Sequence, residues 1–176
     1  MTDKQTDEQA GRPIVSSAHL VSEQSAELSE FEFGMIIASH AFDRWIVRCM
    51  SAAGWSDLGP LDVLVLHSVN HRERAKKIAD ICLVLNIEDT HTVSYSLKKL
   101  VKLGLVAGQR KGKEIFYTTT DQGREACARY REIREDCLIR SLNALGDVNR
   151  DIGDLASLLR GLSGLYDQAA RSAASL

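Results

Sequence analysis

Aromatic residues, prolines and long apolar runs are all scarce in this chain of 176 residues. Only 6% of the residues are aromatic and only two are proline, whereas 44% are hydrophobic. This balance is typical of a globular protein built mainly from helices. No apolar run approaches the roughly 18 residues of a membrane span, and the first residues lack the apolar stretch of a signal peptide. We therefore expect a cytoplasmic protein.

Clusters of metal ligands and enzyme signatures are also missing. The four cysteines are Cys49, Cys82, Cys127 and Cys137. Three of them lie in apolar helical stripes and none forms a CxxC pair, which favours buried thiols over disulfides or zinc ligands. His67 and His71 stand one turn apart, but no third ligand joins them with metal-site spacing. No phosphate-binding glycine loop or nucleophile elbow occurs, so we predict no metal, no cofactor and no enzymatic activity.

Positive charge is not in excess over the chain as a whole, but it is in the middle. The formal net charge is -2. Residues 71–114 nevertheless carry 10 Lys and Arg against 5 Asp and Glu, whereas residues 1–58 carry 4 against 9. A local basic patch, and not the total charge, determines whether a surface attracts an anionic partner.

Apolar periodicity divides the chain into four segments. Residues 1–22 are polar without periodicity, which predicts a disordered tail. Residues 23–58 show helical spacing and predict one long amphipathic helix. Residues 59–120 hold shorter helical patterns and the strand-like runs. Residues 121–176 predict further helices with a break at Gly146-Asp147.

Apolar stripes on the terminal helices need a surface to cover them. The stripe residues that we expect in this contact are Phe31, Met35 and Phe42 in the first helix, and Leu155, Leu158, Leu162 and Leu165 in the last. A second copy of the chain would cover them; the alternative is that these helices pack on their own subunit. Because the middle segment is small, we favour a homodimer.

The middle segment predicts three helices followed by a β-hairpin. The expected elements are helices over about 60–70, 76–85 and 89–103, and strands over 105–110 and 114–118. Gly104 is suited to end the third of these helices, and Lys111-Gly112-Lys113 forms a basic hairpin tip. The fold class is therefore mainly α with a small β-hairpin wing, in the order of a winged helix-turn-helix with long terminal dimerisation helices.

This order of elements can place a helix in the major groove of DNA. On the helix over 89–103, Val93, Leu97 and Leu100 share one side, so the opposite side is polar and basic. The candidate DNA contacts are Thr90, His91, Thr92, Ser94 and Tyr95 near base edges, Lys98, Lys99 and Lys102 near phosphates, and Arg110, Lys111 and Lys113 in the hairpin. The alternative is an ordinary solvated helix face; the adjoining basic hairpin favours DNA.

Several short segments resemble one known family. They are Leu85-Asn-Ile, Thr92-Val-Ser, Leu97-Lys-Lys-Leu100, Leu103-Gly-Leu-Val106 and Ile115-Phe-Tyr-Thr-Thr-Thr-Asp-Gln-Gly123. Together they resemble the winged-helix core of the MarR family over roughly residues 59–125. The resemblance implies that the first and last helices intertwine with a second copy. It also implies that the helix over 89–103 reads a palindromic site and that the wing contacts flanking DNA.

These features predict a DNA-binding transcriptional regulator, a repressor that binds a palindromic operator as a homodimer. Its partners would be double-stranded DNA, a second copy of itself and a small-molecule effector. Phe42, Trp45, Met50 and Trp55 are candidates for lining the effector pocket, although ordinary core packing explains them equally well. Two alternatives remain: a winged-helix module that binds protein without specific DNA binding, and a small-molecule or redox sensor, with Cys49 as the candidate thiol.

Overall fold

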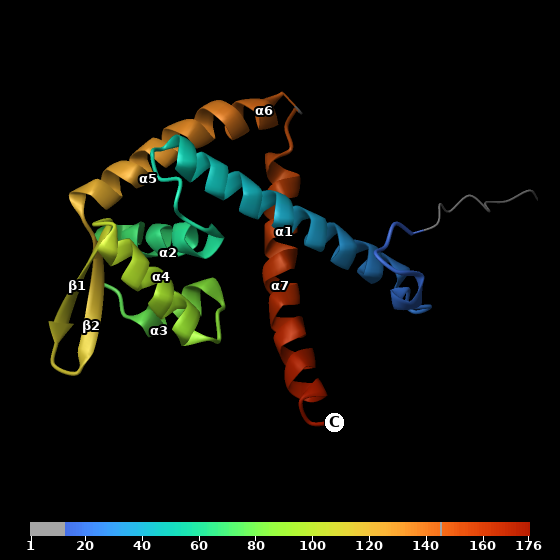
Figure 1. Cartoon of the computed structure of the whole chain (residues 1–176). Helices are drawn as coiled ribbons and strands as arrows, with labels where there is room; N and C mark the ends of the chain where they lie inside the picture. The colour runs from blue at the N-terminus through green and yellow to red at the C-terminus, as the bar shows by residue number, and fades with distance from the viewer. Residues whose placement is uncertain (1–12, 145) are drawn as a thin grey trace, which may run out of the picture. The chain divides into compact units, whose positions relative to one another are not determined.

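A computed structural model of the chain describes residues 13–144 and 146–176 (Figure 1). The helices are α1 (Ala26–Ala52), α2 (Pro60–Asn70), α3 (Ile78–Leu85), α4 (Thr90–Lys102), α5 (Asp121–Arg134), α6 (Arg140–Asn143) and α7 (Asn149–Ala173). The strands are β1 (Val106–Lys111) and β2 (Glu114–Thr119), which pair antiparallel. The predicted fold class, mainly α with a small β-hairpin, is confirmed.

Two compact units make up the chain, with the boundary inside α5 at Cys127 and Ala128. The first unit holds α1 to α4, the hairpin and the start of α5. The second holds the rest of α5, a π-helical stretch at Glu135–Ile139, α6 and α7. Among the described residues, no helix has the length and apolar character needed to cross a membrane.

The predicted tail at residues 1–22 lies largely outside the described residues. Within its remainder, Ala18–Leu20 form a short 3-10 turn. The Leu20 carbonyl accepts a hydrogen bond of 2.6 Å from the Ser29 hydroxyl on α1. The first turn of α1 is therefore joined to the segment before it.

The core of the first unit lies between α1, α2 and α4. Leu66 on α2 and Leu97 and Leu100 on α4 have no exposed surface, and Met50 on α1 joins them. These residues recur at helical spacing, so each helix buries one side and leaves the other in solvent. The Asp89 carboxylate caps α4 by accepting a 2.8 Å hydrogen bond from the His91 amide.

The backbone just before α3 also pairs with strand β2 of the wing. Lys76, just before α3, pairs with Tyr117 of β2 through two backbone hydrogen bonds of 3.0 and 2.8 Å. This pairing explains why α3 begins at Ile78 and not at the predicted Lys76, since Lys76 lies in the bridge and the backbone of Lys77 is extended. The backbone before α3 therefore makes a single β-bridge with the outer edge of β2.

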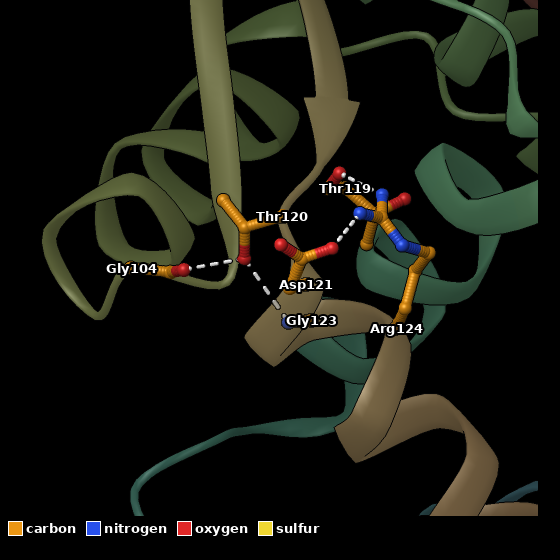
Figure 2. A network of polar contacts seen from close by, with 6 residues as sticks. All are labelled: Gly104, Thr119, Thr120, Asp121, Gly123 and Arg124. Atoms are coloured by element: carbon orange, nitrogen blue, oxygen red, sulfur yellow. Dashed lines mark hydrogen bonds and ion pairs between the residues drawn. The ribbon is translucent and has the colours of Figure 1, made fainter.

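A polar network joins the wing to α5 (Figure 2). The Thr120 hydroxyl donates to the Gly104 carbonyl at 2.6 Å and accepts from the Gly123 amide at 3.0 Å. Thr120 therefore caps α5 and at the same time holds the end of the turn that follows α4.

Arg124 closes the same network from the first turn of α5. Its guanidinium donates to the Thr119 carbonyl at 2.8 Å and pairs with Asp121 (Figure 2). The last residue of β2 is therefore held by a side chain of the helix that follows it.

Gly123 lies where no side chain fits. A Cβ there would stand 2.1 Å from the Leu105 carbonyl oxygen and 2.7 Å from the Thr119 methyl group. We expect Gly123→Ala to lower the free energy of unfolding by about 2 kcal/mol or more, because backbone must move to admit the methyl group. Urea unfolding followed by circular dichroism measures it.

Gly153→Ala is the matched control, since a Cβ at Gly153 in α7 meets nothing within 4 Å in the chain. That variant should be neutral or more stable, because alanine is the better helix former. Equal losses in the two variants would contradict the close approach at Gly123.

Candidate nucleic-acid interface

The exposed face of α4 carries the residues that the sequence predicted for base and phosphate contact. Thr90, His91, Thr92, Lys98 and Lys102 are exposed. The Tyr95 ring is 72% exposed, and Ser94 is half-buried. Opposite them, Val93 is fully buried against the rest of the unit. The helix therefore presents one continuous polar and basic side to solvent.

Lys99 is placed differently from Lys98 and Lys102. Its ammonium lies 2.6 Å from the Asp62 carboxylate on α2, and its side chain is 32% exposed. The sequence analysis predicted phosphate contact for all three lysines because they are close together along the helix. The structure turns Lys99 toward α2, so its nearest anionic partner is a side chain of the same protein.

Basic residues continue from α4 into the wing. Arg110, Lys111 and Lys113 are all exposed, and Gly112 makes the turn with a φ of 65°. The Lys111 ammonium lies 5.6 Å from the centre of the Phe116 ring. The hairpin tip therefore holds several positive charges beyond the end of α4.

Lys77 joins this basic surface, although the sequence analysis did not single it out. Its ammonium lies 5.5 Å from the Phe116 ring and 2.8 Å from the Glu114 carboxylate. The hydrogen bond to Glu114 raises the pKa of Lys77. Because Lys77 and Glu114 are 37 residues apart, no local pattern could have paired them.

Lys76 is buried and was also missed. Its side chain is 6% exposed, and its ammonium donates to the Val69 carbonyl at 3.0 Å, to the His71 carbonyl and to the Arg74 carbonyl at 3.5 Å. A cation among carbonyls at the C-terminus of α2 is favoured by the helix dipole, although burial lowers the pKa of Lys76. This lysine therefore ties the end of α2 to the strand-like segment beside the wing.

A cavity of about 540 Å³ lies between α2 and α3. Its apolar lining comes from Leu64, Ala75, Leu83, Val84 and Leu85, and its polar lining from His67, Ser68, His71, Arg74, Lys76 and Asp80. The Ser68 hydroxyl is buried and has no hydrogen-bond partner among the described residues. The four residues proposed for an effector pocket from the sequence (Phe42, Trp45, Met50 and Trp55) are not among those that line this cavity.

The remaining predicted residues lie on α1, α3, α5 and α7 and in the π-helical stretch. Met35, Phe42, Leu155, Leu158 and Leu165 are exposed in the chain, and Phe31 and Leu162 are half-buried. Cys49, Cys82 and Cys127 are buried as predicted, whereas Cys137 is exposed. Burial raises the pKa of the Cys127 thiol to about 11. That thiol is therefore protonated at neutral pH and poorly reactive.

Comparison with known proteins agrees with this arrangement. Residues 58–123 match a family model described as a winged helix DNA-binding domain. No curated protein sequence matches the chain.

Solved structures extend the likeness beyond that domain. A MarR-family transcriptional regulator from Rhodococcus sp. RHA1 is 14% identical, with a TM-score of 0.60 over 78% of this chain and 95% of that one. The MarR-family regulator NMB1585 from Neisseria meningitidis is 20% identical, with a TM-score of 0.59 over 80% and 96%. The transcriptional repressor CouR, solved bound to a 23-mer DNA duplex, is 23% identical, with a TM-score of 0.63 over 78% and 95%.

The fold and the family model define a protein with a winged helix DNA-binding domain. Its fold resembles that of MarR-family transcriptional regulators, so the resemblance predicted from the sequence is confirmed. Neither the dimer nor the individual DNA contacts are tested by these comparisons, and both stay predictions.

His67 in the cavity wall predicts a pH dependence of stability. Burial lowers the pKa of His67 below its ordinary value of 6.5. Below pH 6.5 the unfolded chain therefore binds more protons at this site than the folded chain does, so folding loses stability as the pH falls. The loss is at most about 1.4 kcal/mol per pH unit.

His67→Gln should flatten the stability curve between about pH 7 and pH 5, measured by urea unfolding at each pH. His71→Gln is the control, since His71 is exposed, and it should keep the slope of the unchanged protein. Equal slopes for the unchanged protein and His67→Gln would contradict the prediction.

Proposed function

We propose that the protein is a MarR-family transcriptional regulator that binds double-stranded DNA. Helix α4 enters the major groove and the β1–β2 wing contacts the flanking backbone. One observation carries the proposal: the face of α4 opposite buried Val93 and Leu97 is exposed, polar and basic. That face leads directly into a basic hairpin, as phosphate contact requires.

The homodimer belongs to the same proposal. Large apolar side chains of α1 and α7 are exposed in the chain, among them Phe42 at 50% and Leu165 at 59%. Apolar patches of this kind mark contact surfaces, and a two-fold axis would present two copies of α4 about one DNA turn apart. A two-fold dimer of this kind would bind a palindromic operator. We propose that it represses by blocking polymerase there.

Selection of bound duplexes from a random DNA pool tests the proposal. We expect a palindrome to be enriched by the unchanged protein and lost with the double variant Lys98→Ala, Lys102→Ala, because those lysines are exposed on α4. The logarithm of the affinity should fall linearly with the logarithm of the salt concentration. A slope whose magnitude is smaller by about 0.9 for each lysine removed would identify phosphate binding.

The charge-matched control is Arg131→Ala, Arg134→Ala, which removes two exposed charges from α5 in the second unit. This variant should enrich the same palindrome. If the folded dimer enriched no sequence and its binding hardly changed with salt, the alternative of a protein-binding module would replace the regulator.

The cavity between α2 and α3 supports a second element of the proposal, a small-molecule effector. Apolar side chains such as Leu64 and Leu83 provide contact with an apolar body, and Arg74 and Lys76 provide positive charge. The buried Ser68 hydroxyl has no hydrogen-bond partner among the described residues. An oxygen atom of a bound ligand would accept its hydrogen bond. We propose that the effector is an amphipathic carboxylate.

Thermal unfolding with a panel of aromatic and aliphatic carboxylates measures effector binding. At 100 times its dissociation constant, a ligand should stabilise the folded chain by about 2.7 kcal/mol. Leu83→Glu places a negative charge on the cavity wall and should abolish the shift. Leu83→Gln, of equal size and uncharged, should weaken it far less; Leu83 is 83% exposed, so both variants should fold. Equal responses in the two variants, or none in any protein, would refute the site.

A further inference from the structure

Asp62 is a buried carboxylate in the first turn of α2. Its side chain is 9% exposed. The Oδ2 atom accepts a 2.9 Å hydrogen bond from the Gly59 amide, which holds the carboxylate at the N-terminus of its helix. The positive end of the helix dipole stabilises a negative charge there. Asp62 is therefore fixed before any partner from another element reaches it.

Lys99 is the partner, reached across the contact between α2 and α4. Its ammonium donates to the same Oδ2 atom at 2.6 Å, which makes a short charge-assisted hydrogen bond. Lys98 and Lys102, the other lysines of α4, have no ion-pair partner in the described part of the chain. One lysine of the three is thus bound to the protein itself.

The apolar contacts of α4 do not define its orientation by themselves. Buried Leu97 and Leu100 hold the helix against α2, but hydrophobic contact is non-directional. A short hydrogen bond from Lys99 to a fixed carboxylate is directional. It therefore restrains the rotation of α4 about its own axis, and with it the direction of Tyr95 and Lys98.

We propose that Lys99 is a positioning residue, which sets the orientation of α4 through Asp62 and does not contact DNA phosphates. This inference rests on the proposed function of α4. It replaces the sequence-based assignment of Lys99 as a phosphate contact and adds Asp62, a residue on another helix, to the determinants of DNA specificity.

Two duplexes of equal length separate the two roles of Lys99: the palindrome enriched from the random pool and an unrelated sequence. We expect Lys99→Met to weaken binding to the palindrome about tenfold while the salt slope and binding to the unrelated duplex stay unchanged. Lys98→Met is the control and should weaken both and lower the slope by about 0.9. Lys99→Arg should restore part of the specificity, because arginine can also reach Asp62.

Asp62→Asn completes a double-mutant cycle with Lys99→Met. Each single variant should weaken binding to the palindrome about tenfold. The double variant should be no worse than either, which is a coupling of about tenfold. A salt slope lowered equally by Lys99→Met and Lys98→Met would overturn the inference, since Lys99 would then contact phosphate.

The same cycle in urea unfolding makes failure of the inference distinguishable from failure of the proposed function. If the losses in free energy of unfolding of the two single variants do not add up to that of the double variant, the ion pair is established by a measurement that involves no DNA. An enriched palindrome with additive stabilities would overturn the positioning role alone. A coupled pair in a protein that enriches no DNA would overturn both proposals.

Discussion

The packing of α4 on α2 is the contact on which the rest of the DNA-binding unit depends. Leu66, Leu97 and Leu100 leave no surface exposed there, and burial of side chains of this size stabilises by roughly 1.5–3 kcal/mol each. Once one side of α4 is committed to this core, its other side must face solvent. The chemistry of the exposed side, and hence what it can bind, follows from that commitment.

Polar contacts around this apolar core fix the orientation of the helices and the wing relative to one another. Asp62 and Lys99 join α2 to α4, and Thr120 joins the turn after α4 to the start of α5. Lys76 joins the end of α2 to the segment that pairs with the wing. Each of these contacts is directional, so helix and wing keep a common orientation toward a partner. The cavity wall includes Lys76, so a bound carboxylate would touch the same connection.

Much of the fold could be predicted from local patterns. The spacing of Val93, Leu97 and Leu100 predicted the buried side of α4, and Gly104 and Gly112 predicted the end of a helix and the hairpin turn. Both glycines have a positive φ in the structure, which side chains other than glycine rarely adopt. The boundary at α3 was less accurate, because Lys76 pairs with Tyr117, 41 positions later in the chain.

The sequence by itself determined the order of elements, the amphipathic sides of the helices and the basic character of the middle segment, because these depend on residues within a few positions of one another. The tertiary structure decided which charges remain available and where a cavity opens. Lys98 and Lys99 are adjacent in sequence, yet only Lys99 reaches Asp62, 37 residues away. Such pairings depend on how helices cross in space, and helical periodicity carries no information about the side chains of another element.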